Sequence, residues 1–331
     1  MTPELTSTLP AHPEQAAGAD RPIVGTFTMP TARLTALLAL IVSTIGVSVL
    51  AGPVQPVQAL AAARTCAQRS PGFHTSTFRA GGVVRSYTVY VPSTWSPAGN
   101  RPSVWVLQGS GGEAEGTIWG SKLKVQADQD GFVVVAPQGL GLPSSWDVST
   151  TTLRISGSDA AMFTRLPAKV ASDWCLDPSR QCVAGYSAGS VVTHAMACRG
   201  GFPFAGYAGA AAQSWLSSCP TLNPFDFVYF HGTADPYVPF GGDASLPSVP
   251  ASLAEMASAD ACEASPAVTS IGPDITQYTW TRCAAGRRLL LDVLQGGGHV
   301  WPGADYVPGL GNNTTTISAD QVVSDFWHLA S

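Results

Sequence analysis

A serine flanked by glycines directly follows a short apolar run in this 331-residue chain: Gly185-Tyr186-Ser187-Ala188-Gly189 comes after residues 182–184. The pattern is typical of a strand that turns sharply into a helix and holds the serine at the turn. Glycine is needed on either side because the strand and the helix approach too closely for larger side chains. A hydroxyl presented in this way can be activated by a neighbouring base, so the pentapeptide predicts a nucleophile. Because glycine, alanine and serine are abundant here, a purely structural loop is the alternative.

Apolar runs that alternate with helical patterns cover the rest of the chain. Continuous apolar runs predict strands that are buried on both faces of a parallel sheet. The alternation predicts one α/β domain at residues 62–331, with a mostly parallel central sheet flanked by helices. Pro167 should kink or split the helix that contains it. The predicted strands are 83–91, 104–107, 132–135, 182–186, 227–230 and 289–294, and the predicted helices are 118–129, 158–174, 188–198 and 318–329.

The N-terminal segment, residues 1–61, is expected to be absent from the mature protein. A basic residue, Arg33, precedes the apolar run at 34–49, and small residues follow up to Ala61. This order is typical of a signal peptide cleaved near Ala61, and the run is short for a membrane span, which takes about 20 residues. A signal anchor is the alternative, and Met29 would make a more ordinary start than the first residue. The segment predicts a secreted protein without membrane contact after cleavage.

Charge and cysteine content narrow the possible partners. Charged residues make up only 12% of the chain and the net charge is −5, which argues against a nucleic acid partner. The seven cysteines all follow the predicted cleavage site, so an exported chain should contain disulfides and one unpaired thiol. Cys182 lies in the strand before Ser187, where a small buried side chain is needed, and we take it as the free thiol. No metal-binding pairing of cysteine or histidine is found, so we expect neither a metal nor a cofactor.

Two further strand ends carry the partners that a serine nucleophile needs. Asp235 follows the apolar run at 227–230, and His299 follows the run at 289–294 and three glycines. The chain order Ser, Asp, His, with each residue at a strand end, is that of the α/β-hydrolase catalytic triad. We therefore expect Ser187 to be the nucleophile, His299 its base and Asp235 the carboxylate that orients the base.

Other histidines fit the role of base less well. His231 closes the strand before the Asp235 loop and is expected to be a structural hydrogen-bonding residue. His194 lies about two turns into the helix after Ser187, which carries it roughly 10 Å away by helical rise alone.

Two backbone N–H groups are expected to form an oxyanion hole. One is that of Ala188, directly after the nucleophile, and the other comes from the glycine-rich loop at residues 108–112, after an early strand. We assign the second donor to Ser110, or failing that to Gly109. A generic flexible turn is the alternative for this loop.

The chain resembles the secreted esterase family that includes polyhydroxybutyrate depolymerases and the feruloyl and acetylxylan esterases of carbohydrate esterase family 1. The matching stretches include residues 85–92, 175–180, 231–235 and 297–303, and the last of these is the most specific to the family. The resemblance implies an α/β-hydrolase fold and ester hydrolysis. It also implies the disulfides Cys198–Cys219 and Cys262–Cys283, and a third, Cys66–Cys175.

The chain departs from the family in two places. The family usually has His-Gly where this chain has Gln108-Gly109, and often Asn-Gly where it has Ala188-Gly189. The first departure affects the shape of the oxyanion loop, but backbone donors survive a change of side chain.

The sequence therefore predicts a secreted, monomeric serine esterase. Trp301, beside the histidine, and Trp146 could form an apolar wall for an acyl or aromatic group, with ordinary packing as the alternative. The substrate is left open between a short polyester such as polyhydroxybutyrate, a feruloylated or acetylated polysaccharide, and a small soluble ester. A peptidase with the same triad and a non-catalytic binding protein that keeps the fold are the other possibilities.

Overall fold

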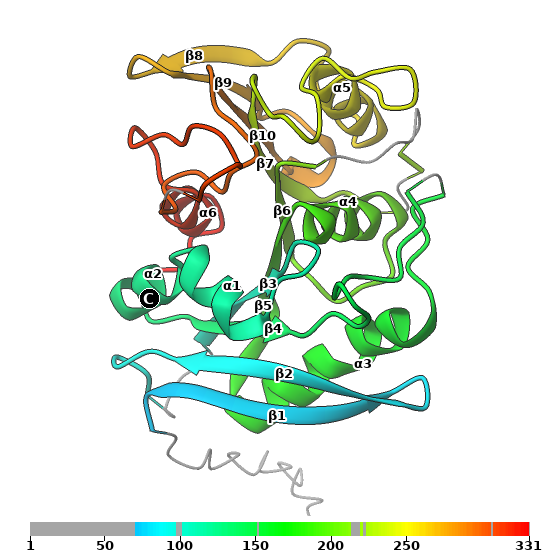
Figure 1. Cartoon of the computed structure of the whole chain (residues 1–331), viewed down its shortest axis with the longest axis vertical. Coiled ribbons are helices and arrows are strands. Elements are labelled where there is room, and N and C mark those ends of the chain that lie inside the picture. Colours follow the sequence, from blue (N-terminus) through cyan, green and yellow to red (C-terminus); the bar gives the residue numbers. More distant parts are fainter. Residues whose placement is uncertain are drawn as a thin grey trace, which may run out of the picture. The chain divides into compact units, whose positions relative to one another are not determined.

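A mixed, mostly parallel sheet forms the centre of the protein (Figure 1). The computed structural model describes residues 70–96, 101–150, 152–212, 219–220, 223–305 and 307–330. The predicted signal peptide, its cleavage site and Cys66 lie outside these residues. The sheet has ten strands in the order β1-β2-β4-β3-β5-β6-β7-β10-β9-β8. The strands are β1 (Gly72–Ala80), β2 (Val83–Val91), β3 (Arg101–Leu107), β4 (Val133–Pro137), β5 (Leu176–Tyr186), β6 (Gly206–Ala210), β7 (Asp226–Gly232), β8 (Ala267–Ile271), β9 (Ile275–Trp280) and β10 (Leu289–Leu294).

The central strands, from β4 through β3, β5, β6 and β7 to β10, all run parallel. Antiparallel pairs extend the sheet at both ends, with β1 and β2 beside β4, and β9 and β8 beside β10. The carboxyl ends of the parallel strands meet at one edge of the sheet, which is where ligands bind in open α/β sheets.

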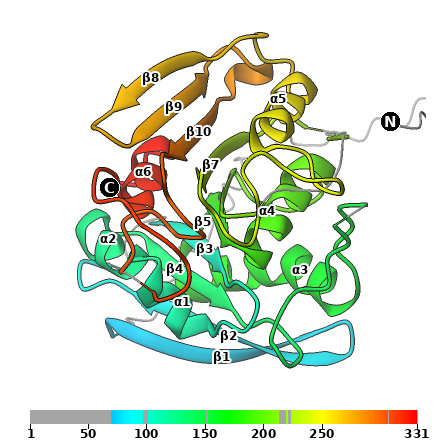
Figure 2. The ribbon, with the colours of Figure 1, turned by 45° about the horizontal axis from the view of Figure 1, so that its top comes forward.

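Helices cover both faces of the sheet (Figures 1 and 2). On β3, Trp105 and Leu107 belong to one apolar core, which also contains residues of α3, α4 and α5. Val104 and Val106 point to the other core, with residues of α1, α2 and α6. This two-residue alternation explains why β3 is apolar throughout. The helices are α1 (Ala114–Gly120), α2 (Leu123–Asp130), α3 (Gly157–Trp174), α4 (Ala188–Arg199), α5 (Val249–Ala259) and α6 (Ala319–Phe326), with a short 3-10 turn η1 (Ala284–Gly286).

One expectation about helices was wrong, and a second is narrowed by the structure. The single helix expected at 118–129 is two helices, α1 and α2, because Lys122 between them has φ of 58°, which no α-helix accommodates. Of the two outcomes expected at Pro167, a kink or a split, the split does not occur, since α3 continues through Pro167. Pro167 is buried together with Phe163 and Val170 of the same helix, and this burial offsets the hydrogen bond that the proline cannot make.

No helix in the described part of the chain is long and apolar enough to cross a membrane.

Candidate active site

Ser187 lies at the tight turn between β5 and α4, with φ of 52° and ψ of −119°. A Cβ atom on Gly185 would lie 2.2 Å from the carbonyl oxygen of Gly189, and one on Gly189 would lie 2.3 Å from that of Leu107. Both distances are far inside van der Waals contact, so only glycine fits on either side of the serine. The Ser187 N–H donates to Ala210 O at 2.9 Å, which ties the turn to β6.

The structure brings His299 and Asp235 to this serine. Nε2 of His299 lies 2.9 Å from Ser187 Oγ, and Nδ1 lies 2.8 Å from Asp235 Oδ2. A carboxylate can only accept, so Nδ1 carries the ring proton and Nε2 is left to accept from the serine hydroxyl. The three side chains come from the ends of β5, β7 and β10, and they form one continuous chain of hydrogen bonds.

Asp235 is held as a carboxylate by the loop that follows β7. Its Oδ1 accepts from the backbone N–H groups of Tyr237 and Val238, both at 2.8 Å. Burial raises the pKa of Asp235, but the hydrogen bonds from His299 and from these N–H groups outweigh it and bring the pKa below its ordinary value. Asp235 therefore stays charged and fixes the tautomer of His299.

The glycine-rich loop after β10 places His299. A Cβ atom on Gly298 would lie 2.1 Å from Leu310 O, so only glycine fits at this position of the loop. The His299 N–H donates to Leu310 O at 2.6 Å, and the Tyr186 hydroxyl donates to His299 O at 2.7 Å. The ring of Tyr237 packs edge-on against the imidazole, with centroids 5.2 Å apart.

The loop at residues 108–112 lies against the nucleophile. A Cβ atom on Gly109 would be 3.2 Å from Ser187 Cβ, so the loop backbone touches the serine. Gly111 N–H donates to Ser144 O and Gly112 N–H to Gly109 O. The N–H of Ser110 has no acceptor among the described residues. That of Ala188 is in the first turn of α4, where no intrahelical acceptor exists. Both N–H groups are thus available to a substrate.

Hydrogen bonds from the side chains of Gln108 and Trp146 fix the shape of this loop. The Gln108 side-chain amide donates to Gly112 O at 2.5 Å and to Ser144 Oγ at 2.8 Å. The indole N–H of Trp146 donates to Gln108 O at 2.9 Å, and its ring packs on Phe163 in the core. The structure therefore does not place Trp146 in the wall of the pocket beside Ser187; it fixes the shape of the loop instead.

A cavity of about 450 Å³ lies between α1 and the loop after His299, and its lining includes Gly109, Ser110 and Tyr186, which lie next to Ser187, but not Ser187 itself. Its lining is mainly apolar, with carboxylates from Glu113 and Asp305 and no lysine or arginine among its residues. Trp301 contributes to the wall and packs on Phe230, with ring centroids 6.0 Å apart. The other apolar contributions include those of Val106, Tyr186, Val300, Val307 and Leu310.

The two other buried histidines in the described part of the chain, His194 and His231, make no hydrogen bond with Ser187. His231 Nε2 lies 3.5 Å from Asp235 Oδ2, the same oxygen that His299 contacts. His194 in α4 donates from Nδ1 to Ser190 O at 3.0 Å, and burial lowers its pKa to about 4. Two contacts of His299, with Tyr186 and with Tyr237, were not expected from the sequence. Tyr186 directly precedes Ser187 and Tyr237 follows Asp235 by two residues, and this proximity in sequence was the only available signal.

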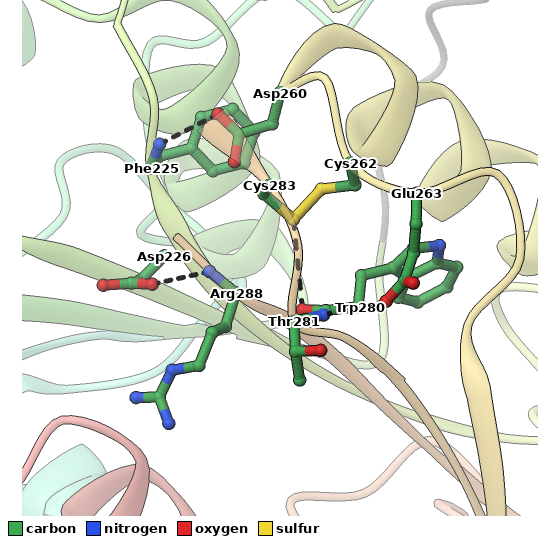
Figure 3. Close-up of a disulfide and its surroundings, with 9 residues drawn as sticks. All are labelled: Phe225, Asp226, Asp260, Cys262, Glu263, Trp280, Thr281, Cys283 and Arg288. Carbon is green, nitrogen blue, oxygen red and sulfur yellow. Dashed lines mark hydrogen bonds between the residues drawn. A yellow bond between two sulfur atoms is a disulfide. The ribbon is translucent and has the colours of Figure 1, made fainter. Parts of the chain in front are cut away.

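The disulfides Cys198–Cys219 and Cys262–Cys283 are present, and Cys182 is buried and unpaired. The Cys66–Cys175 pair includes a residue outside the described part of the chain and stays a prediction. Figure 3 shows the second disulfide with the buried carboxylate of Asp260 beside it. Among the described residues, these two cysteines and Asp260 are the one group close enough to resemble a metal site, and the disulfide occupies both sulfurs.

In sequence, the chain is similar to proteins named as esterases. It is 29% identical to the putative esterase NocK of Nocardia uniformis subsp. tsuyamanensis over 253 residues, covering 68% of this chain and 73% of that protein. It is 25% identical over 225 residues to the bifunctional acetylxylan esterase/xylanase XynS20E of Neocallimastix patriciarum, covering 68% of this chain and 32% of that protein. A probable feruloyl esterase C of Aspergillus niger is 25% identical over 187 residues, covering 54% of this chain and 66% of that protein. The expected resemblance to these esterases is confirmed.

Solved structures give the fold. An acetyl xylan esterase from Aspergillus awamori superposes with a TM-score of 0.54 at 17% identity, covering 78% of this chain and 100% of that one. Thermogutta terrifontis esterase 2, phosphonylated by cyclosarin, gives a TM-score of 0.50 at 16% identity, covering 78% of this chain and 94% of that one. No protein-family model matches the chain. The protein has the α/β-hydrolase fold that the sequence predicts.

Proposed function

We propose that the protein is a secreted serine esterase in which Ser187, His299 and Asp235 form the catalytic triad. The observation that carries this proposal is the continuous hydrogen-bond chain from Ser187 Oγ through the imidazole to the carboxylate, at 2.9 and 2.8 Å. The similarity to named esterases supports ester hydrolysis as the reaction.

In the proposed mechanism, Ser187 Oγ attacks the ester carbonyl carbon while His299 Nε2 takes the hydroxyl proton. The tetrahedral intermediate collapses, the C–O bond to the alcohol breaks, and His299 returns the proton to the leaving alkoxide. Water then attacks the acyl-enzyme with His299 as base, which releases the acid and restores the serine. Asp235 stays ionised throughout and stabilises the imidazolium form of His299.

The negative charge on the carbonyl oxygen needs two donors at each tetrahedral stage. The N–H groups of Ala188 and Ser110 lie on the two segments that touch Ser187, and neither has an acceptor in the part of the chain described. We assign both to the oxyanion hole. Gly109 is the alternative second donor, because its N–H also has no acceptor among the described residues and its backbone lies against Ser187.

The pocket indicates an uncharged, largely apolar group on the substrate. Its lining offers apolar surface and the carboxylates of Glu113 and Asp305 but no lysine or arginine, and Lys122, outside the lining, is paired with Asp305 at 3.2 Å. A short alkanoyl or an aryl group fits this chemistry, so acetyl, feruloyl and hydroxyalkanoyl esters all remain within the proposal.

A fluorophosphonate probe tests the nucleophile directly. It should label the wild-type protein at Ser187, as located by peptide mapping, and should not label Ser187→Ala. A folded wild-type protein that is neither labelled nor active on any ester would favour the non-catalytic alternative.

A substrate panel tests the pocket. The kcat/KM for p-nitrophenyl butyrate should be at least about tenfold higher than that for mono-p-nitrophenyl succinate. The succinyl group has the same chain length as the butyryl group but ends in a carboxylate. Methyl ferulate, acetylated xylan, hydroxybutyrate oligomers and a peptide p-nitroanilide complete the panel. Faster turnover of the peptide than of every ester would favour a peptidase.

Secretion is tested separately. Expressed with its own leader, the protein should be recovered from the medium with an N-terminus near Ala62. Retention of the intact chain in the membrane fraction would instead favour a signal anchor.

A further inference from the structure

A second buried histidine contacts the Asp235 carboxylate. His231 lies near the end of β7, and its side chain is completely buried. Its Nε2 lies 2.9 Å from Val238 O and 3.5 Å from Asp235 Oδ2, the oxygen that also accepts from His299. One carboxylate oxygen therefore contacts two imidazole rings, and only that of His299 reaches the serine.

The contacts of His231 determine which nitrogen carries its proton. A backbone carbonyl can only accept, so Nε2 of His231 must be protonated to donate to Val238 O. Its Nδ1 is then free to accept from the Tyr229 hydroxyl, 2.7 Å away. Burial, and to a smaller extent the nearby His299, lowers the pKa of His231, although Val238 O and Asp235 act in the opposite direction. The ring is neutral, with its N–H on the side of the Asp235 loop.

The other charged or titratable groups around His231 come from several elements. Tyr229 precedes it on β7, Asp235 is on the following loop, His299 is on the loop after β10, and His194 is on α4. Of these, Asp235 is the only carboxylate. His231 donates its Nε2–H to Val238 O, and the same nitrogen lies 3.5 Å from Asp235 Oδ2, so one group contacts both the backbone of the loop and its carboxylate.

We propose that His231 is a positioning residue for ester hydrolysis: its Nε2–H, locked by Tyr229, holds the Val238 carbonyl and the Asp235 carboxylate so that Oδ2 faces His299 Nδ1. This inference rests on the proposed triad. It assigns no proton transfer to His231, because the ring touches neither the serine nor the space that a substrate would occupy. Its effect is exerted through Asp235.

Substitution at His231 separates positioning from packing. His231→Phe keeps the ring volume and removes the N–H, while His231→Gln places an amide N–H near the position of Nε2. His194→Phe is the matched control, because His194 is also buried and packs edge-on against Tyr229, but has no contact with Asp235. Each variant is measured for kcat and KM on p-nitrophenyl butyrate, for the pH dependence of kcat/KM, and for thermal unfolding.

We expect His231→Phe to lower kcat by about 10- to 100-fold with KM changed less than about threefold, because the lost contact acts on the base and not on the substrate. The acid limb of kcat/KM, which is its fall at low pH, should move to lower pH, since a carboxylate that no longer faces His299 Nδ1 stabilises the imidazolium less. His231→Gln should recover most of kcat. His194→Phe should leave the acid limb where it is in the wild type.

Two results would overturn the inference: an unmoved acid limb in His231→Phe, or a kcat no lower than that of His194→Phe. If His231→Phe does not fold, Tyr229→Phe takes its place, because it removes only the hydroxyl that locks the ring. It should move the limb in the same direction, and an unmoved limb would count against the inference. Failure of the proposed function is distinct, since the wild-type protein would then neither hydrolyse esters nor take up the fluorophosphonate.

Discussion

Ser187 has a backbone conformation that non-glycine residues rarely adopt, with φ of 52°. Such a conformation costs on the order of 1–3 kcal/mol and persists only where the surroundings enforce it. Here Gly185, Gly189 and the Ser187 N–H bond to Ala210 O enforce it, and the result is a hydroxyl aimed at His299. The strain and the proposed catalytic role therefore have one structural origin.

Two substitutions of this serine separate the strain from the chemistry. Ser187→Ala and Ser187→Gly should both lower kcat at least about a thousandfold, because neither has a nucleophile. Ser187→Gly should be more stable to urea than Ser187→Ala by about 1 kcal/mol, since glycine adopts positive φ without penalty. A Ser187→Ala enzyme that keeps more than about a tenth of the wild-type rate would contradict the assignment, because less than about 1.4 kcal/mol of barrier would then depend on the hydroxyl.

The pH dependence of activity follows from the pair formed by His299 and Asp235. The imidazole must be neutral to accept the serine proton, so kcat/KM should fall as the pH drops and the ring becomes charged. The pKa of Asp235 is below its ordinary value, so the carboxylate stays ionised across that range and the acid limb should follow a single proton. A plot of log kcat/KM against pH should have a limiting slope of about 1. A rate independent of pH between about 4 and 8 would show that no histidine acts as base in the limiting step.

At the scale of elements, the junction of β5 and α4 is the most tightly constrained part of the fold. Gly189→Ala should destabilise the protein by several kcal/mol or prevent its folding, because a Cβ atom there would lie 2.3 Å from Leu107 O in β3 and backbone cannot easily move aside. Gly120→Ala is the control, since its Cβ would meet nothing within 4 Å and alanine favours a helix. Urea unfolding of both variants, with labelling of Ser187, measures the effect. Equal stability of the two variants would show that the strand and the helix are free to separate.

Elements with a clear apolar pattern, including β2, α3 and α6, were predictable, whereas β6 and β8 were not. The strands β3, β4, β5, β7 and β10 and the helix α4 were expected because burial on two faces leaves a continuous apolar sequence. β6 reads Gly-Tyr-Ala-Gly-Ala, in which small residues make room for neighbours: a Cβ on Gly206 would clash with Trp327. β8 lies at the sheet edge and is largely exposed, so its sequence has no apolar stripe.

The residues of the candidate site were predictable from the sequence, and the contacts that support them were less so. The positions of Ser187, Asp235 and His299 at strand ends could be inferred from local sequence, because parallel strands end at one edge. The support that Trp146 and Gln108 give to the oxyanion loop could not, since it joins segments far apart in the chain through tertiary contacts. The same holds for His231, whose bond to Val238 O depends on how the loop folds back.

At the scale of the whole described domain, the parallel strands carry the proposed chemistry and the antiparallel ends of the sheet carry none of it. Apolar cores on both faces fix β5, β7 and β10 relative to one another, so packing brings the three strand ends together. Polar groups inside these cores are costly unless paired. Asp260, beside the Cys262–Cys283 disulfide, is such a group: Oδ1 accepts from Phe225 N–H at 3.2 Å, and Oδ2 is buried with no partner among the described residues (Figure 3).

Asp260 should make stability depend on pH with the opposite sign to an ordinary salt-bridged carboxylate. Burial raises its pKa to about 6, against the bond from Phe225 N–H, which lowers it. A carboxyl whose pKa is higher in the folded state favours folding at low pH, and this contribution is lost as the pH rises through about 6. Asp260→Asn keeps an acceptor for Phe225 and carries no charge. It should be more stable than the wild type by on the order of 2 kcal/mol at pH 7.5 and nearly equal to it at pH 4.

Asp243→Asn provides the contrast, because hydrogen bonds from Ser245 lower the pKa of that exposed carboxyl, and its loss should not stabilise the protein at either pH. Urea unfolding of the three proteins at both pH values measures the difference. Equal stability of Asp260→Asn and the wild type at pH 7.5 would mean that Asp260 is solvated or paired in solution.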